Sequence, residues 1–361
     1  MKVLVLDFFN LVKRYLYTSK LTDLEDSELI DIVTTNILNK INVLVHNFSP
    51  DFVYICSDNG NNRRAMAITG GNYKANRKRN KSLTEEEKEK NYTEYLKSVF
   101  ETLPIPFIDI RDTEADMVIY CLTNYLIKLD NSIEIVIASS DSDFIQLLSD
   151  NVKIYDWYKE DIDKDNWYEK YDKNGGLYLS PGNYAIAKSI VGDTADNIAG
   201  IKNVGWKKVL KLFNILYSCY GQKYIEKFDL TATDLILLLD DYVSDIDNKE
   251  LEFVNKMLQL IKINKELIDK NQSIIELSNI ETPFIYNIME TIKRKTFDDT
   301  INFDRKEFMR LLHFERYKDN DENVEYKKIV AKNMKASMTF YTLAKKMSNS
   351  AKILKNRMNN K

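Results

Sequence analysis

Six acidic residues stand where predicted strands end or where the following helix is expected to begin. Three apolar, strand-like runs are closed by aspartates, and the helical pattern after a fourth run opens with two acids. The carboxyl ends of parallel strands meet at one edge of a sheet, so these carboxylates are expected to gather there. Their mutual repulsion requires a cation, and oxygen ligands favour Mg²⁺ or Mn²⁺. The six are Asp7, Asp58, Glu114, Asp116, Asp141 and Asp143.

Asp141 and Asp143 lie one residue apart in the stretch ASSDSDF, which follows the apolar run IEIVI. Side chains at positions i and i+2 point to the same side only while the chain is extended. We therefore expect an extended backbone here, with both carboxylates directed at the metal site. Acids at strand ends also occur in ordinary loops, and Glu114 and Asp116 also suit a helix N-terminus. Acidic residues recur at this position in four separate segments, which favours a metal site over ordinary loops.

The composition removes several other chemistries. The chain has 361 residues, with two histidines and three widely separated cysteines that form no CxxC pair. A Ser-His-Asp triad, a zinc-thiolate centre and a disulfide framework are therefore unsupported. Cys56, Cys121 and Cys219 are interpreted as packing residues. No apolar run reaches the ~18 residues that span a bilayer and no cleavable leader is recognisable, so we expect a cytoplasmic protein.

Strand and helix patterns alternate through the first half of the chain, which predicts an α/β fold with a parallel sheet and helices on both faces. The segment between Gly70 and Phe100 is too highly charged for a core helix and is expected to be a solvated helical projection or a loop. From Leu177 onward helical patterns dominate. Residues 327–361 hold ten basic residues and no acid, whereas the whole chain has a net charge of −3. A basic tail therefore follows an acidic body.

Apolar residues recur every three or four positions in this tail, which predicts one apolar stripe on one helix or two. We expect this helix to dock on the body; the alternative is that its ten cations lie along duplex DNA or meet an acidic replication partner. A membrane-surface helix is an alternative without other support. The stripe consists of Val330, Met334, Met338, Tyr341, Ala344, Met347, Ala351, Leu354 and Met358.

Two stretches resemble the 5′-nuclease superfamily. GDTADNIAGIKNVGWKKVLKLF (192–213) is similar to its helix, three-residue turn, helix signature, and DNGNNRRAMAITGGNYKANR (58–77) to its DG…R…YKxxR segment. The order of the acidic motifs along the chain agrees. The resemblance is strongest to bacteriophage 5′→3′ exonucleases and flap endonucleases, including phage proteins named ribonuclease H. It covers residues 1–213, and RKEFMRLLHFERY (305–317) is similar to the close of the 5′-nuclease domain of DNA polymerase I.

The resemblance implies an α/β fold with a PIN-like parallel sheet flanked by helices, a helical arch, and a following helical domain that contains a helix-three-turn-helix motif. The implied organisation is a catalytic domain at 1–176 with the arch at about 73–100, a helical DNA-binding domain at 177–318 with the helix-three-turn-helix at 185–213, and a basic amphipathic tail at 319–361.

The resemblance also implies two Mg²⁺ ions, with Mn²⁺ as an alternative. The first ion would be held by Asp7, Asp58, Glu114, Asp116 and Asp141, and the second would be surrounded by Asp143, Asp193 and Asp196. Met117 stands where many family members have another acid, which implies an altered affinity for the second ion. A K⁺ ion bound by backbone carbonyls of the helix-three-turn-helix is a further implication.

Lys74 and Arg77 are expected to neutralise charge that develops on phosphoryl oxygens. Tyr73 would stack on a displaced base, and the turn in GIKNVGWKKV would bind phosphates of one duplex strand without reading sequence. The alternatives are a solvated basic face and an ordinary helical hairpin. The expected DNA-binding set is Tyr73, Arg63, Arg64, Arg79, Gly200, Lys202, Gly205, Lys207 and Lys208.

These features predict a metal-dependent, structure-specific 5′-nuclease, a 5′→3′ exonuclease or flap endonuclease, that hydrolyses phosphodiesters of 5′ ends, flaps or RNA primers in phage DNA replication. The expected partners are DNA or an RNA–DNA duplex and, through the tail, a single-strand binding protein or a sliding clamp. We expect a monomer in the host-cell cytoplasm, away from membranes. The alternatives are a PIN-type ribonuclease, which lacks the arch and helical turn, and a catalytically weakened DNA-binding replication scaffold, which Met117 alone favours.

Overall fold

The computed structural model describes residues 1–18, 26–60, 63–75, 83–167, 169, 179–221, 230–245, 250–299, 301, 303–312 and 324–359. The chain packs into two compact units. The first contains residues 1–60, 81–140 and 282–361, and the second contains residues 61–80 and 141–281. These units are defined by packing alone. The functional domains expected from the sequence have different bounds and stay a prediction.

Parallel strands form the sheet of the first unit, in the order β3-β2-β1-β4. β1 and β2 are buried along nearly their whole length, as expected for parallel strands covered on both faces. The register pairs Asp7 with Cys56 and Leu6 with Ala138, so the carboxyl ends of three strands lie at one edge. These strands are β1 (Lys2–Asp7), β2 (Phe52–Ser57), β3 (Phe107–Asp109) and β4 (Glu134–Ala138).

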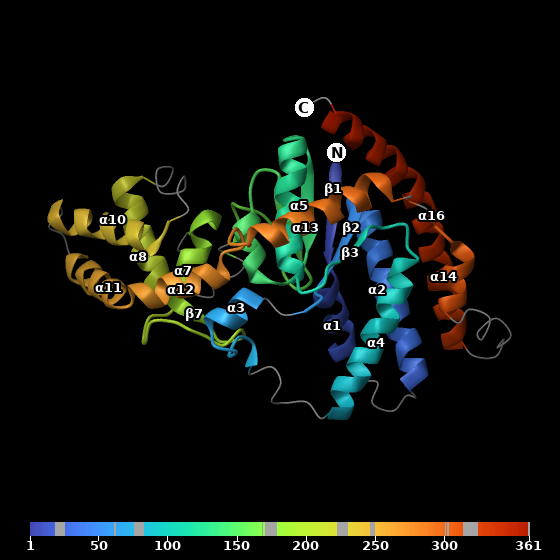
Figure 1. Cartoon of the computed structure of the whole chain (residues 1–361), viewed down its shortest axis with the longest axis horizontal. Coiled ribbons are helices and arrows are strands. Elements are labelled where there is room, and N and C mark those ends of the chain that lie inside the picture. The colour runs from blue at the N-terminus through green and yellow to red at the C-terminus, as the bar shows by residue number, and fades with distance from the viewer. Residues whose placement is uncertain are drawn as a thin grey trace. The chain divides into compact units, whose positions relative to one another are not determined.

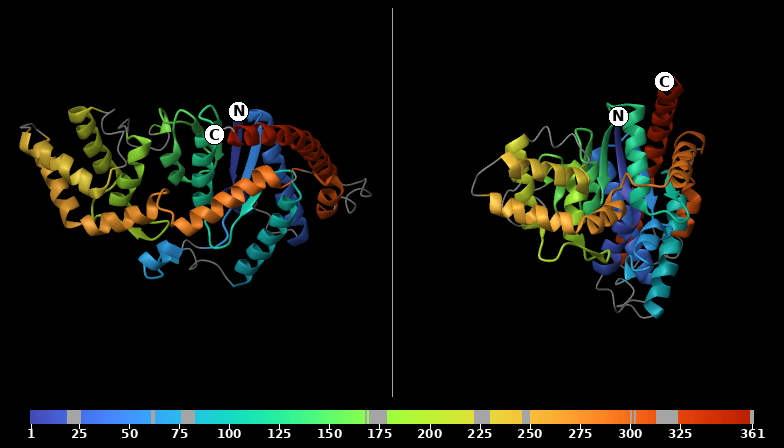
Figure 2. Two further views of the ribbon diagram at one scale, coloured as in Figure 1. Left: turned by 45° about the horizontal axis from the view of Figure 1, so that its top comes forward. Right: turned by 60° about the vertical axis from the view of Figure 1, so that its left-hand side comes forward.

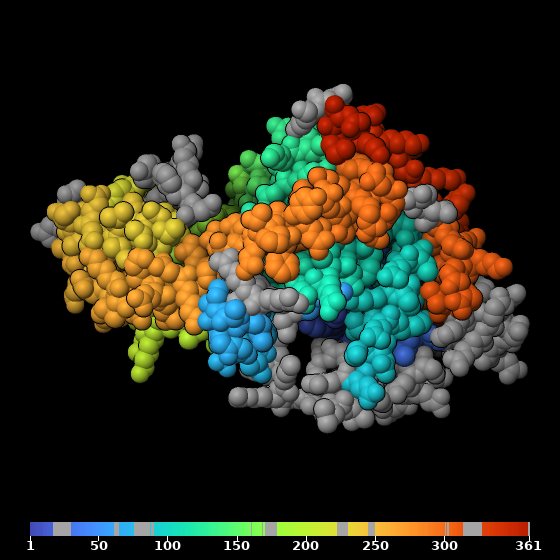
Figure 3. Space-filling model, in the orientation of Figure 1, coloured from blue at the N-terminus to red at the C-terminus, as the bar shows by residue number. Residues whose placement is uncertain are grey.

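Helices cover this sheet. α5 (Ala115–Leu129) packs on β1 and β2, and α13 (Thr282–Lys293) lies against α5 on the face shown in Figure 3. α1 (Phe8–Thr18) packs on β1, β2 and α2 (Asp26–Phe48). The sheet therefore has the helical cover that the alternating pattern predicts. The unit also contains the π-helical turn η4 (Arg294–Asp298) and α14 (Arg305–Leu311).

The polar segment before β3 ends in a helix, α4 (Leu83–Glu101). Leu96, Val99 and Phe100 of this helix are fully buried, and the hydroxyl of Tyr95 donates a hydrogen bond of 2.7 Å to the carbonyl oxygen of Leu311. The expectation of a wholly solvated segment is therefore wrong for the C-terminal half of α4. The charged residues that dominate the composition precede this apolar half.

The C-terminal segment forms one long helix, α16 (Val324–Asn359), which packs on α2 in the first unit (Figures 1 and 2). The hydroxyl of Thr339 donates a hydrogen bond of 2.5 Å to Oδ1 of Asn42. Phe340 is fully buried, with its ring centroid 5.9 Å from that of Phe308. The docked helix expected from the sequence is therefore present.

The face that α16 buries differs from the predicted stripe in its N-terminal half. Met334, Met338 and Tyr341 are 42%, 66% and 53% exposed. Small or polar residues take their place because they allow two helices to approach closely. The buried face is formed by Asn333, Ala336, Ser337 and Phe340, followed by Ala344, Met347 and Leu354 as predicted.

α7 (Tyr184–Val191) lies at the centre of the second unit and packs against α8 (Trp206–Tyr220) and α12 (Lys265–Ile275). Every residue from Tyr184 to Ile190 is buried, so this short helix is enclosed on all sides. The other elements of the unit are α3 (Arg63–Ile68), the 3₁₀ helices η2 (Ser142–Leu147) and η3 (Pro181–Asn183), the antiparallel pair β5 (Val152–Asp156) and β6 (Glu160–Ile162), α10 (Ala232–Asp245) and α11 (Leu251–Ile263).

A tight connection joins α7 to α8. It contains two antiparallel strands, β7 (Gly192–Asp193) and β8 (Ile198–Ala199). Gly192 ends α7 with φ of 83°, and a Cβ on Gly200 would overlap the carbonyl oxygen of Val191. Glycine is required at Gly200 because two backbone segments touch there. The stretch thus forms the two expected helices, but the connection between them runs from 192 to 205 and is longer than the expected three-residue turn.

Cys56 and Cys121 are buried, as packing residues should be, but Cys219 on α8 is exposed. The packing interpretation is therefore wrong for Cys219, because this position of the helix faces solvent. Across the described ranges, none of the helices has both the length and the apolar character that crossing a bilayer demands.

Candidate metal-binding site

Asp7 closes β1 and is 7% exposed. Its Oδ2 atom accepts a hydrogen bond of 2.8 Å from the Ser139 hydroxyl, and its Oδ1 atom accepts one of 3.1 Å from the backbone N–H of Asn10. Asn10 lies in the first turn of α1, where the helix dipole favours a negative charge. Burial, and then the charge of Asp7, raise the pKa of the Cys56 thiol. Two hydrogen bonds therefore fix the orientation of the Asp7 carboxylate at the sheet edge.

Asp58 joins the end of β2 to the start of α5. Its Oδ1 atom accepts a hydrogen bond of 2.6 Å from the backbone N–H of Ala115. Glu114 is the N-cap residue of α5 and is 4% exposed, and Asp116 lies in the first helical turn. The dipole of α5 thus helps to stabilise several carboxylates at one place. We call Asp7, Asp58, Glu114 and Asp116 the edge carboxylates.

Lys97 of α4 reaches the same region of the first unit, although the sequence analysis did not single it out. Its Nζ atom lies 2.8 Å from Oδ2 of Asp109 and 3.5 Å from the carbonyl oxygen of Asp58. Lys97 thus brings a positive charge to the ends of β2 and β3. The sequence does contain a signal for this position. Lys97 lies three residues before Phe100, and this helical spacing places Lys97 beside the buried face of α4.

A lysine lies among the expected metal ligands of the second unit. The Lys188 ammonium donates a hydrogen bond to Oδ1 of Asp143 and lies 2.7 Å from Oδ2 of Asp193. The Lys188 side chain is 8% exposed. Oδ1 of Asp193 in turn accepts hydrogen bonds of 2.8 and 3.3 Å from the backbone N–H groups of Ala195 and Asp196. We call Asp141, Asp143, Lys188, Asp193 and Asp196 the Lys188 cluster.

Burial and charge act against each other in this cluster. Burial raises the pKa of Asp143; Lys188 opposes this shift, and Asp141 adds to it. Burial alone would lower the pKa of Lys188, but the attraction of Asp143 and other neighbours outweighs it and raises this pKa. For Asp193, Lys188 and the backbone hydrogen bonds outweigh burial and lower the pKa. Lys188 therefore stays protonated at neutral pH.

The backbone of the ASSDSDF stretch is extended at Asp141, with φ of −74° and ψ of 122°, and then turns into η2 at Ser142. Oδ1 of Asp141 accepts a hydrogen bond of 2.9 Å from the backbone N–H of Asp143. The expectation that the chain stays extended through Asp143 is therefore wrong. Asp141 acts as an N-cap, because the first N–H groups of a helix lack partners within the helix.

Tyr73 is 7% exposed and packs with Ala65, Ala185 and Ile198. Its hydroxyl donates a hydrogen bond of 3.3 Å to Oδ2 of Asp196. A base can stack only on an exposed ring face, so the burial of Tyr73 disfavours the expected stacking role, which stays a prediction. Tyr73 instead orients Asp196 from within a small apolar cluster.

Lys74 has φ of 55°, and its backbone N–H donates a hydrogen bond of 3.1 Å to the carbonyl oxygen of Asp196. Its ammonium lies 4.6 Å from the centroid of the Tyr73 ring. The structure thus brings Lys74 to the Lys188 cluster. Arg77 and Arg79 lie outside the described residues, and of Arg63 and Arg64 only the backbone, at the start of α3, is described.

The remaining expected DNA-binding residues lie on the turn and on α8. Gly205 is the N-cap residue of α8, and Lys207 and Lys208 lie in the first turn. Lys202 and Lys207 are exposed, whereas Lys208 donates a hydrogen bond of 2.8 Å to the carbonyl oxygen of Asn203. Backbone N–H groups at this helix start, together with the lysines, form a surface suited to an anion.

The donor chemistry of the expected metal ligands fits a hard divalent cation. All eight are carboxylates, with four in each unit, and neither thiol nor imidazole stands among them. In the part of the chain that the structure describes, no three Asp, Glu, His or Cys side chains are gathered closely enough to hold one metal ion.

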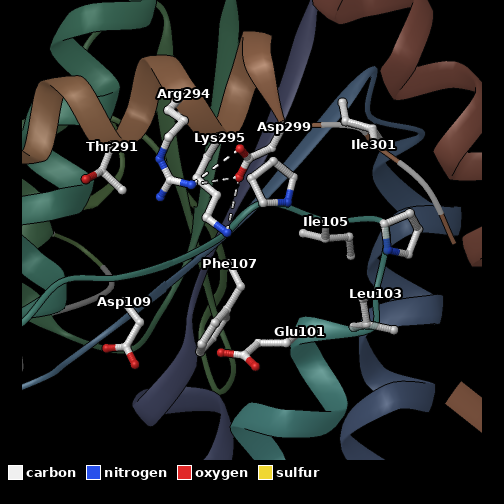
Figure 4. A pocket seen from close by; sticks show the side chains of 12 residues that line it. Glu101, Leu103, Ile105, Phe107, Asp109, Thr291, Arg294, Lys295, Asp299 and Ile301 are labelled. Carbon is white, nitrogen blue, oxygen red and sulfur yellow. Dashed lines mark hydrogen bonds and ion pairs between the residues drawn. The ribbon is translucent and has the colours of Figure 1, made fainter. Parts of the chain in front are cut away.

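A separate pocket of about 460 Å³ lies in the first unit between α4, β3 and η4. Figure 4 shows Arg294 and Lys295 directed at the carboxylate of Asp299, at 3.2 and 3.5 Å. Asp109 lines the opposite side and pairs with Lys97. The charges in this pocket compensate one another, and the edge carboxylates do not line it. It is therefore distinct from the candidate metal site.

Comparisons with known proteins bear on the family and the fold. Residues 2–172 match the family model described as the 5′-3′ exonuclease, N-terminal resolvase-like domain. DNA polymerase I of Caldicellulosiruptor bescii is 30% identical over 222 residues, which cover 59% of this chain and 24% of that protein. The flap endonuclease of Escherichia phage T5 is 27% identical over 217 residues, which cover 55% of this chain and 71% of that protein.

A solved structure supports the fold. The bacteriophage T5 flap endonuclease, in a pseudo-enzyme-product complex with DNA and metal ions, superimposes with a TM-score of 0.56 at 18% identity. The match covers 87% of this chain and all of that one. The fold is therefore that of an α/β nuclease with a PIN-like, mostly parallel sheet. Residues 2–172 thus resemble the 5′-3′ exonuclease family, and the chain spans about a quarter of the DNA polymerase I that it matches.

Proposed function

We propose that the chain is a metal-dependent, structure-specific 5′-nuclease that hydrolyses phosphodiesters at 5′ ends, flaps or RNA primers during DNA replication. The edge carboxylates carry this proposal, because they occupy the carboxyl edge of the sheet within the segment that matches the 5′-3′ exonuclease family. The likeness to a flap endonuclease that binds DNA and metal ions supports it.

Both groups of carboxylates serve this reaction in the proposal. As the sequence predicts, the first divalent ion would be held by Asp7, Asp58, Glu114, Asp116 and Asp141, and the second by Asp143, Asp193 and Asp196. When bound, two such ions supply a hydroxide nucleophile at neutral pH and stabilise the leaving oxygen. Mg²⁺ is the expected ion and Mn²⁺ an alternative, since the donors are oxygen atoms.

Side chains of the protein orient the metal-binding carboxylates and neutralise charge on the substrate. Ser139 and Asn10 fix the carboxylate of Asp7, and Tyr73 fixes that of Asp196. Lys74 and Arg77 neutralise charge on the phosphoryl oxygens. The segment expected at about 73–100 acts as the arch under or through which a free 5′ strand passes in this proposal; its residues 76–82 lie outside the described residues.

The α7–turn–α8 segment binds one strand of duplex DNA through its phosphates in this proposal. Lys202 and Lys207 offer cations, and the first turn of α8 offers backbone N–H groups. Such contacts position a duplex without reading its sequence. The helical region at 177–318 then acts as the DNA-binding domain, with a K⁺ ion at the turn as a further element.

α16 offers a surface for a replication partner. Met338 and Lys335 line a groove of about 520 Å³ beside α2, together with Val43, His46 and Lys346. Exposed apolar and basic side chains suit an acidic, partly apolar segment, such as one from a single-strand binding protein or a sliding clamp. Duplex DNA is the alternative ligand of these cations.

Cleavage assays test the proposal. A 5′-labelled flap and a nicked RNA-primed duplex are incubated with the protein in Mg²⁺ or in EDTA. We expect release of 5′ products in Mg²⁺ only. A catalytically weakened scaffold would bind both substrates and cleave neither. A PIN-type ribonuclease would cleave single-stranded RNA without needing a 5′ junction, and the helical turn between α7 and α8 disfavours it.

A further inference from the structure

Lys188 occupies a position that has no role in the proposed reaction so far. Its ammonium bonds both Asp143 and Asp193, the two carboxylates assigned to the second metal ion. The side chain starts from α7, whose residues from Tyr184 to Ile190 are all buried. A buried ammonium persists only with paired charges, and buried carboxylates likewise need a cation. Each partner therefore depends on the other in the metal-free protein.

We propose that Lys188 is a built-in counter-cation, which holds Asp143 and Asp193 in the metal-free protein and has to withdraw its ammonium before a divalent ion binds there. This inference rests on the proposed function, because it assumes that these carboxylates are metal ligands. In this proposal, Lys188 regulates whether the second metal ion is bound. Lys188 is a positioning residue that acts through the two aspartates.

Competition follows from charge and space. The ammonium contacts oxygen atoms that a metal ion would also have to contact. An ammonium and a divalent ion at such short range repel each other, and the cluster holds four carboxylates for one lysine. The flexible four-carbon stem of lysine allows the head group to move aside while α7 stays packed. Lys188 therefore weakens the binding of the second ion. In the metal-free protein, its ammonium offsets the repulsion between the carboxylates of the cluster.

Calorimetric titration with Mn²⁺ in the absence of DNA tests this competition. For Lys188→Met we expect the weaker of two binding events to tighten by about tenfold or more, while the tighter event is unchanged. Lys262→Met is the matched control, because Lys262 pairs with Asp240 at 2.6 Å in the same unit but near none of the expected ligands. Identical isotherms for Lys188→Met and wild type would overturn the inference.

A second measurement uses the wild-type protein and so does not depend on how well a variant folds. Acetylation of individual lysines is followed by mass spectrometry with and without saturating Mn²⁺. We expect Mn²⁺ to accelerate modification of Lys188 several-fold, because the displaced ammonium loses its partners, and to leave Lys262 unchanged. An equal rate for Lys188 in both conditions contradicts displacement.

The two proposals fail in different ways. If wild type binds no Mn²⁺, the metal-dependent function fails, and the inference about Lys188 fails with it. If wild type binds Mn²⁺ and neither the Lys188→Met titration nor the acetylation rate responds, only the inference fails. A weaker ion that tightens in Lys188→Met, with a faster modification of Lys188 in wild type, supports both.

Discussion

The hydroxyl of Ser139 donates a hydrogen bond of 2.8 Å to Oδ2 of Asp7, and both residues are buried. Ser139 directly follows β4 and Asp7 closes β1, so this bond joins the ends of two neighbouring strands of the sheet. The orientation of a proposed metal ligand is thus set by a residue that is no ligand itself. Such outer partners tune both the geometry and the basicity of metal ligands.

Replacement of Ser139 by alanine should raise the Mg²⁺ requirement of cleavage strongly and lower the free energy of unfolding only slightly. We expect a loss of about 1 kcal/mol in the free energy of unfolding and a rise of roughly tenfold or more in the Mg²⁺ concentration for half-maximal cleavage. Ser132→Ala is the control, since Ser132 is exposed and its hydroxyl bonds Asp130 instead. An unchanged Mg²⁺ requirement would show that Asp7 needs no such orientation.

Tyr73→Phe separates positioning of Asp196 from base stacking. Phenylalanine keeps the ring and loses only the hydroxyl that bonds Asp196. We expect cleavage at limiting Mg²⁺ to fall by about fivefold, which corresponds to one net hydrogen bond. Tyr220→Phe, which loses a hydroxyl bonded to Leu238 and Asp241, should leave cleavage unchanged. Full activity of Tyr73→Phe at limiting Mg²⁺ would favour stacking.

Two neighbouring aromatic residues of α16 test how this helix docks. Phe340 is fully buried, whereas Tyr341 is 53% exposed. Phe340→Ala should lower the free energy of unfolding by about 3–5 kcal/mol through the cavity that it leaves, and Tyr341→Ala by about 0.5 kcal/mol or less. Urea denaturation measures both. Comparable losses for the two variants would place the buried face where the apolar stripe predicted it.

The ion pair between Asp51 and Lys346 gives α16 a pH dependence. Burial raises the pKa of Asp51, but a hydrogen bond from the backbone N–H of Lys2 and the Lys346 ammonium at 3.1 Å outweigh it and lower this pKa. A lowered pKa contributes stability above the unfolded value of about 3.9 that is lost as pH falls through the folded value.

Asp51→Asn should therefore cost about 1 kcal/mol or less in the free energy of unfolding at pH 7, because the pair is partly solvated. The difference from wild type should shrink as pH falls below about 4. Unfolding measured from pH 7 to pH 3 checks this. A difference that does not change with pH would mean that the charge of Asp51 contributes nothing.

The sheet and its edge carboxylates could be predicted from the sequence because each is marked by a pattern of residues that are adjacent in the chain. An apolar run followed by an acid marks the end of β1 and of β2 at Asp7 and Asp58 without knowledge of neighbours. The turn between α7 and α8 is visible for the same reason, since Gly192 and Gly200 are local requirements of the backbone.

The Lys188 cluster depends on tertiary packing and was missed. A single lysine in the helical pattern YAIAKSIV suggests a solvated position, but α7 is apolar on every other side, and a lysine in such a helix has to be buried and paired. The tail was misjudged for a related reason. Hydrophobicity selects Met334 and Met338, whereas close packing of α16 on α2 selects Ala336 and Ser337.

The central claim is that the carboxylates proposed as metal ligands serve a metal-dependent hydrolysis. Its most direct test is the rate at which a 5′-labelled flap is cut in Mg²⁺ by wild type, Asp7→Asn and Asp141→Asn, with Asp150→Asn, an exposed partner of Lys164, as the control. We predict that both site variants fall by at least about a hundredfold, that the control matches wild type, and that EDTA abolishes cutting. Cleavage that survives EDTA, or that stays near the wild-type rate in either site variant, would contradict the account.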